Sequence, residues 1–175
     1  MTGSSIEKLA ETLRGGDRGA GAAQLGSALA AVADPFERTL VLHLGALAAA
    51  AAGDLAGLER FLSEAAALEA GAGFRVGSQH TLHQLALFSS NQGNIRAVAS
   101  YYRATAATLQ QQKNAVGLAF CHRSLGEILL FLGKVPEALR YWGFAEQSLR
   151  LREQPEAEQL RVWIAALAAD GSLPG

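Results

Sequence analysis

The sequence is poor in several residue types, and each shortage excludes a class of structure. It contains one cysteine, Cys121, so no internal disulfide framework is expected. Its longest apolar run, 46–52, is far shorter than the roughly 20 apolar residues that a membrane-spanning helix needs. The first residues lack the basic start and apolar centre of a signal peptide. We therefore expect a cytoplasmic protein without a membrane segment.

Charge is also scarce, and it is unevenly distributed. Charged residues make up 18% of the chain, against roughly 25% in typical domains, whereas hydrophobic residues make up 50%. The net charge is −1, yet no acidic residue lies between Glu69 and Glu127. This basic middle either meets an anionic partner or the acidic end of a second copy, or it is chance scatter over solvated faces. Because the net charge is slightly negative, we do not expect a nucleic-acid partner.

The strongest positive signal is an internal repeat of 40 residues. Gly53, Gly93 and Gly133 mark the same position in three segments. An apolar stripe at helical spacing precedes each glycine and another follows it, so each segment predicts two helices joined at the glycine. One helix pair cannot bury both of its faces, so neighbouring pairs must stack. We expect three superposable hairpins, each coupled only to its neighbours.

The pattern predicts helices throughout and no strand. Asp34-Pro35-Phe36-Glu37 is a helix start, with an N-cap Asp, Pro at the first position and Glu at the third. The expected helices span 5–14, 18–32, 35–52, 54–70, 78–92, 94–112, 115–132, 135–151 and 155–169. We expect one domain, 1–175, made of a degenerate hairpin (1–33), three full repeats (34–73, 74–113 and 114–153) and a capping helix with its tail (154–175). Ala169-Asp170-Gly171 resembles a further hairpin turn, so the alternative is a piece of a longer protein.

This layout resembles the tetratricopeptide repeat. The third repeat matches that family's motif best, at Leu125-Gly126, Leu129, Gly133, Ala138, Trp142 and Ala145. The period exceeds the family's usual length of about 34 residues and is similar to long-helix variants in adaptor proteins and in bacterial transcription activators. The resemblance implies an all-α, right-handed superhelical array of antiparallel helix hairpins, an α-solenoid. It also implies that Trp142 is buried against the first helix of its own hairpin and the following helix.

In that family, the first helix of each hairpin lines a concave groove that binds peptides or partner helices. His43, His83 and Arg123 are spaced by 40 residues and would occupy equivalent positions in such a groove. The predicted partner-binding residues of this concave strip are His43, His80, His83, Asn91, Arg123 and Glu127. Apolar and cationic residues in combination suit a peptide with apolar and acidic residues. The alternative is that these are merely exposed polar residues.

No catalytic motif is present, so we expect neither an enzyme nor a cofactor. His43, His80 and His83 could in principle hold Zn²⁺, but adjacent hairpins lie about 10 Å apart and no second shell is evident, so no metal is expected. We predict a non-enzymatic scaffold or adaptor that binds a protein or peptide. The alternatives are the regulatory repeat region of a larger bacterial transcription regulator and a self-associating homodimer module.

Overall fold

The computed structural model describes residues 3–16 and 18–168, and within those residues the chain forms nine helices and no strand. They are α1 (Gly3–Arg14), α2 (Arg18–Ala31), α3 (Pro35–Ala52), α4 (Leu55–Gly71), α5 (Arg75–Ser90), α6 (Ile95–Gln111), α7 (Ala115–Phe131), α8 (Val135–Arg150) and α9 (Glu156–Ala168). The all-α prediction is confirmed. The expected tail, 169–175, lies outside the described residues. None of the described helices is long and apolar enough to cross a membrane.

Side-chain caps and left-handed glycines set the helix boundaries. Asp34 Oδ1 accepts hydrogen bonds from the backbone N–H groups of Phe36 and Glu37, at 2.8 and 2.9 Å, and α3 begins at the next residue. Gly53, Gly93 and Gly133 have φ angles of 71°, 75° and 77°, which glycine adopts at little cost. The turns predicted at these three glycines are therefore confirmed.

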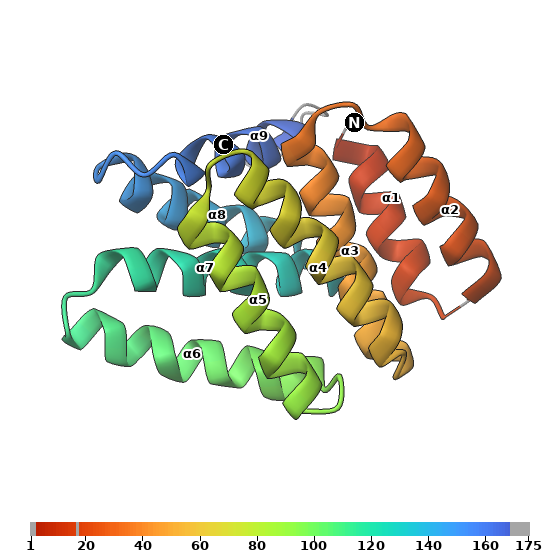
Figure 1. Cartoon of the computed structure of the whole chain (residues 1–175), viewed down its shortest axis with the longest axis horizontal. Helices are drawn as coiled ribbons and strands as arrows, with labels where there is room; N and C mark the ends of the chain where they lie inside the picture. The colour runs from red at the N-terminus through yellow and green to blue at the C-terminus, as the bar shows by residue number, and fades with distance from the viewer. Residues whose placement is uncertain (1–2, 17, 169–175) are drawn as a thin grey trace.

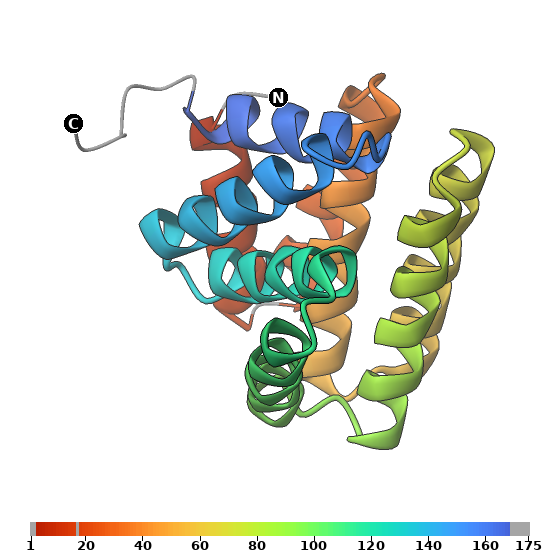
Figure 2. The same cartoon turned by 90° about the vertical axis from the view of Figure 1, so that its left-hand side faces the viewer.

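The helices run in two main directions. In Figure 1, α1 to α5 cross the view steeply, whereas α6 and α7 lie nearly horizontal. Figure 2 shows α6, α7, α8 and α9 stacked one above another beside α3, with α4 and α5 standing together on the other side. The chain changes direction at the turn between α5 and α6, residues 91–94.

The middle helix pair differs from the other two. Helix α3 packs along α4, and α7 packs along α8, but α5 packs along α4, α6 packs along α7, and α5 and α6 contact each other sparsely. The expectation of three superposable hairpins is therefore wrong for the middle pair. Only one large apolar side chain, Phe88, occurs among the buried residues of α5, so this helix has little apolar surface to bury against α6.

The last helices return to the first ones. Helix α3 contacts α1, α7 and α9, and α1 also contacts both α7 and α9. Arg14 at the end of α1 donates a hydrogen bond from Nη1 to the backbone oxygen of Phe131, at 3.1 Å. The expectation that each repeat couples only to its neighbours is therefore wrong, because helices from both ends of the chain share one core.

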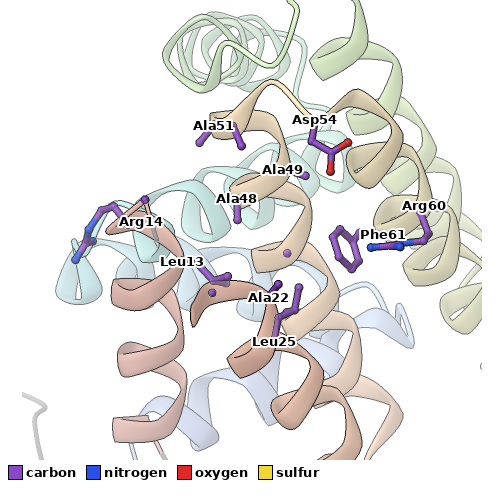
Figure 3. Close-up of a pocket in the computed structure, with 14 residues that line it drawn as sticks. Leu13, Arg14, Ala22, Leu25, Ala48, Ala49, Ala51, Asp54, Arg60 and Phe61 are labelled. Carbon is purple, nitrogen blue, oxygen red and sulfur yellow. The ribbon is translucent and has the colours of Figure 1, made fainter. Parts of the chain in front are cut away.

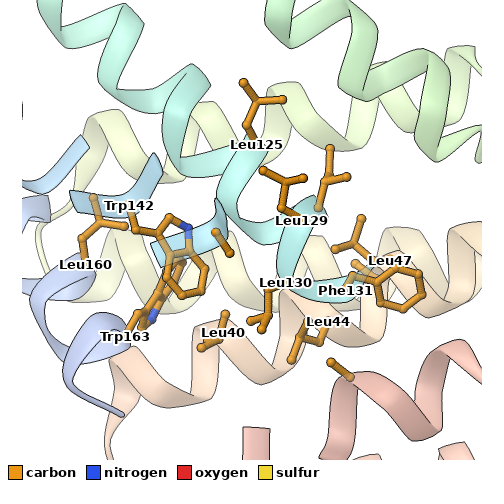
Figure 4. Close-up of a cluster of buried hydrophobic side chains, with 14 of the residues drawn as sticks. Leu40, Leu44, Leu47, Leu125, Leu129, Leu130, Phe131, Trp142, Leu160 and Trp163 are labelled. Carbon is orange, nitrogen blue, oxygen red and sulfur yellow. The ribbon is translucent and has the colours of Figure 1, made fainter. Parts of the chain in front are cut away.

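Two tryptophans lie at the centre of that core. Trp142 of α8 and Trp163 of α9 are fully buried, with ring centroids 5.3 Å apart (Figure 4). Trp142 Nε1 donates a hydrogen bond to the backbone oxygen of Arg123, at 3.0 Å, and the indole lies against Gly126, where a side chain would collide with it. The predicted burial of Trp142 between α7 and the following helix is confirmed.

Candidate functional site

Three residues of the predicted concave strip come together, but inside the protein. His43 of α3 and Arg123 and Glu127 of α7 retain 1%, 0% and 2% of their surface. The expectation that these three side chains lie open to a partner is therefore wrong. They belong to a buried charge cluster that joins five helices and consists of Thr39, His43, Glu69, Thr81, Gln84, Arg123, Ser124, Glu127, Glu156 and Gln159, all of them buried.

Arg123 is the hub of this charge cluster. Its Nη2 donates to Glu69 of α4 and, at 3.1 Å, to Thr81 Oγ1 of α5, while its Nε donates to Glu127 Oε1 at 3.0 Å. Its guanidinium carbon lies 5.3 Å from the ring centroid of Trp163. Burial alone would lower the pKa of Arg123, but the carboxylates of Glu69 and Glu127 raise it, so the guanidinium stays charged.

His43 completes the pairing of Glu127. Its Nδ1 lies 3.0 Å from Glu127 Oε1, and its Nε2 lies 3.5 Å from Arg123 Nη2. Because a guanidinium can only donate, Nε2 can take part in the contact with Arg123 only as an acceptor. Burial would raise the pKa of Glu127, but His43 first and then Arg123 and Gln84 outweigh burial and lower it to about 2. Glu127 is therefore a carboxylate at neutral pH.

Helix α5 supplies one hydrogen bond to each of three buried carboxylates. The Gly77 backbone N–H donates to Glu156 Oε1 at 3.0 Å, Thr81 Oγ1 to Glu69 Oε2 at 2.7 Å, and Gln84 Nε2 to Glu127 Oε2 at 2.8 Å. The donors lie at i, i+4 and i+7, one stripe of the helix, while the acceptors come from α9, α4 and α7. The cluster therefore locks α5 against three other helices, which is a structural role.

The other residues of the predicted strip lie at or outside the edge of the charge cluster. His80 is half-buried, with Nε2 2.7 Å from Ser124 Oγ, and burial followed by Arg123 lowers its pKa to about 3. His83 is exposed beside Tyr101, with ring centroids 6.1 Å apart. Asn91 Nδ2 donates to the Leu87 backbone oxygen at 2.8 Å and so ends α5. The strip is therefore divided between core, edge and surface.

The histidines that were weighed as zinc ligands do not converge. His80 and His83 have ring centroids 6.3 Å apart, and His43 is bonded to Glu127. Across the residues that the structure describes, no group of three or more His, Cys, Asp or Glu side chains could hold a metal ion.

A separate groove opens along the C-terminal half of α3 (Figure 3). It encloses about 520 Å³ between α1 and α2 on one side and α3 and α4 on the other. Leu13, Leu25 and Phe61 supply its large apolar side chains, and Arg60 stands at its rim, whereas the Arg14 side chain points away from the groove and donates to the Phe131 backbone oxygen. Sequence reasoning missed this α1–α4 groove, because its small residues were interpreted only as places where helices approach closely.

The repeat explains why the α1–α4 groove exists. Five α3 residues line it, and all are small: Gly45, Ala48, Ala49, Ala51 and Ala52. Eighty residues later, α7 carries large apolar residues at the same positions: Leu125, Ile128, Leu129, Phe131 and Leu132. The first four of these are buried, as Figure 4 shows for Leu125, Leu129 and Phe131. The α1–α4 groove is thus present because α3 lacks the large side chains that α7 carries at the equivalent positions of its own repeat.

No protein-family model, curated protein or solved structure matches the chain. The candidate function follows from the geometry of the buried charge cluster and of the α1–α4 groove.

Proposed function

We propose that the protein is a non-enzymatic scaffold that binds a protein or peptide partner in the α1–α4 groove. The observation that carries this proposal is the groove itself, about 520 Å³ of mostly apolar space with Arg60 at its rim. Concave, apolar surfaces with a few polar groups are the usual form of a binding site. The buried members of the concave strip are engaged with one another, so the proposed binding surface moves from that strip to the groove.

We further propose that the chain is a tetratricopeptide-like array, a right-handed superhelix of antiparallel hairpins, whose last helices fold back on the first. The 40-residue repeat and the turns at Gly53, Gly93 and Gly133 support this proposal. The packing of α3 on α4 and of α7 on α8 supports it as well. In such an array the face that carries His43 and Arg123 would be concave, and here α5 and α9 cover it through the charge cluster.

Filling the groove tests the scaffold function. Ala48→Ile with Ala51→Phe gives α3 the side chains that α7 carries at Ile128 and Phe131. Ala104→Ile with Ala107→Phe is the matched control, because it makes the same changes at the same spacing on an exposed face of α6. Tagged wild type and both variants would be used to capture proteins from the source cell, with mass spectrometry as the readout.

We expect wild type and control to enrich the same partner, and the filled variant to lose it while its melting temperature stays close to that of wild type. Ala22→Leu fills the groove from the α2 wall and serves as a second variant if the α3 changes disturb folding. A partner that binds all of these proteins equally would contradict the proposal.

Self-association is the second candidate, and one observation favours it. Phe144 of α8 and Leu151, the residue that follows α8, are 51% and 68% exposed. Large apolar side chains that are exposed and gather into a patch mark contact surfaces on many proteins. Sedimentation of wild type and of Phe144→Ser with Leu151→Ser would test it: a dimer lost in the variant supports self-association, and a wild-type monomer at high concentration rules it out.

A further inference from the structure

The floor of the α1–α4 groove has the geometry of a helix face. Gly45, Ala48, Ala49 and Ala52 lie at i, i+3, i+4 and i+7 of α3, so they form a straight stripe about 10 Å long. Leu25 of α2 and Phe61 of α4 stand on either side of this stripe (Figure 3). These two side chains meet over Gly45, where a Cβ would lie 3.0 Å from Leu25 and 3.4 Å from Phe61, so the stripe is closed at that end. Past Gly45 the floor is made of the alanines, and large apolar side chains of an incoming helix can fill the space above Ala48 and Ala49.

The counterpart in α7 indicates which side chains the groove lacks. At the positions of the α3 stripe, α7 has Leu125, Ile128, Leu129 and Leu132, and α6 packs closely along α7. Helix α2, which precedes α3 as α6 precedes α7, contacts α3 only sparsely. The missing volume is therefore that of aliphatic side chains at helical spacing, which an incoming amphipathic helix provides.

The positive charge of Arg60 at the rim of the groove indicates which charge the occupant carries. Arg60 lies with its guanidinium carbon 4.6 Å from the ring centroid of Phe61, and no ion pair joins it to a carboxylate of the described chain. Asp54 is the carboxylate among the described lining residues, and its Oδ1 accepts a hydrogen bond from the Gly57 N–H, which caps α4. The rim therefore favours an occupant that brings its own carboxylate.

We propose that the occupant of the α1–α4 groove is an acidic amphipathic helix of a partner protein. That helix lies over the mouth of the groove, and its large aliphatic side chains at i, i+3, i+4 and i+7 enter to fill the space above Ala48 and Ala49. A carboxylate at the flank of the same helix meets Arg60. This is the helix-in-groove mode of peptide recognition, and the inference rests on the scaffold function proposed above.

Three synthetic peptides test this assignment by fluorescence anisotropy. The first is an acidic helical peptide with leucine at i, i+3, i+4 and i+7 and glutamate beside the leucines. The second has lysine in place of each glutamate, and the third has serine in place of each leucine. Each is titrated with the wild type, with Arg60→Glu, with Ala48→Ile/Ala51→Phe and with the matched control Ala104→Ile/Ala107→Phe.

For the wild type and the matched control, we expect the acidic peptide to bind about fivefold tighter than the basic one, the range of a partly exposed ion pair. Arg60→Glu should reverse that preference. The serine peptide and the filled variant should each lose about tenfold or more in affinity, since each removes apolar burial. Equal binding of acidic and basic peptides, or full affinity in the filled variant, would overturn the assignment.

Two further results separate this inference from the scaffold function. If no peptide binds but groove filling still abolishes capture of the cellular partner, the occupant is not an acidic helix and the scaffold function stands. If dodecanoate binds the wild type and not the filled variant, while no peptide binds, an acyl chain is the occupant and the inference fails. If groove filling leaves partner capture intact, the scaffold function itself fails.

Discussion

Arg123 of α7 forms a fully buried ion pair with Glu69 of α4, a residue 54 positions earlier in the chain. A buried charge is costly unless it is paired and hydrogen-bonded. Further hydrogen bonds support the pair: the guanidinium also donates to Glu127 and Thr81, and the Glu69 carboxylate also accepts from Thr81 and Gln159. One arginine thus ties α4, α5, α7 and α9 into a single unit.

Replacing Arg123 should be severely destabilising. Arg123→Ala leaves Glu69 and Glu127 buried without their cation, and breaking a buried pair in this way costs about 3–5 kcal/mol. Arg103→Ala on the exposed face of α6 is the control and should change stability by less than about 0.5 kcal/mol. Urea unfolding of both variants provides the measurement. The sequence pattern predicted Arg123 in an open groove, where its loss would cost little, so similar stability of the two variants would contradict the buried ion pair.

Acid should weaken the fold through His80. Its pKa is about 3 in the folded protein and about 6.5 when unfolded, so the unfolded chain binds a proton more readily. The contribution of neutral His80 is fully present above pH 6.5 and is lost as the pH falls towards 3. His122, whose pKa burial also lowers, acts in the same direction. Glu127 adds a second loss between about pH 4.5 and 2, because its pKa is depressed in the folded state.

The free energy of unfolding, measured at pH 7.5, 6.0 and 5.0, checks this dependence. We expect it to fall from one pH to the next in the wild type, and to fall less in His80→Gln, which keeps a polar group near Ser124 but does not titrate. An unchanged pH dependence in His80→Gln would show that His80 is not the group responsible.

Two turn glycines with nearly the same φ should respond differently to alanine. Gly53→Ala has open space for a Cβ, so its cost is the left-handed backbone alone, about 1–2 kcal/mol. A Cβ at Gly93 would also press on the backbone of Ala50, with its carbonyl carbon at 3.1 Å. Gly93→Ala should therefore be clearly the less stable of the two in thermal melts. Equal destabilisation would mean that the α5–α6 turn does not rest on α3.

Trp142 should be important for the whole domain. Trp142→Ala removes a fully buried indole and its hydrogen bond, at a cost of about 3–5 kcal/mol, whereas Phe144→Ala on the exposed side of α8 should cost little. Because α9 packs on α1 and α3, hydrogen exchange should accelerate in those helices as well as in α7 to α9. Faster exchange confined to the C-terminal helices would favour repeats that couple only to their neighbours.

The repeat predicted most of the fold because local signals define it. The N-cap of Asp34 and the turn at Gly53 depend on neighbouring residues, and the structure keeps both. The 40-residue shift also holds information on burial: Leu44, Gln84 and Ser124 are equivalent, and all three are buried. Gln84 and Ser124, polar residues at a position where the first repeat has leucine, were the available signal for a buried polar cluster.

The candidate sites could not be predicted in the same way, because they depend on contacts between distant helices. Equal spacing predicted that His43, His83 and Arg123 occupy one row. Helix α5 packs differently from α3 and α7, so His83 is exposed while the other two are buried. The ion pair between Arg123 and Glu69 joins residues 54 positions apart, and no local sequence pattern indicates it. The contrast between Ala48 and Ile128 is visible in the sequence, yet only the sparse contact of α2 with α3 turns it into a groove.

The most direct test of the central claim is methyl NMR of the protein with its captured partner. If the α1–α4 groove is the binding surface, the methyl signals of Leu25 and Ala48 should shift on addition of the partner. Those of Leu149 of α8 and Leu160 of α9, which are fully buried and do not line the groove, should stay in place. Shifts at Leu151, the residue after α8, with none at Leu25 or Ala48, would contradict the account and place the partner on the surface that carries Leu151.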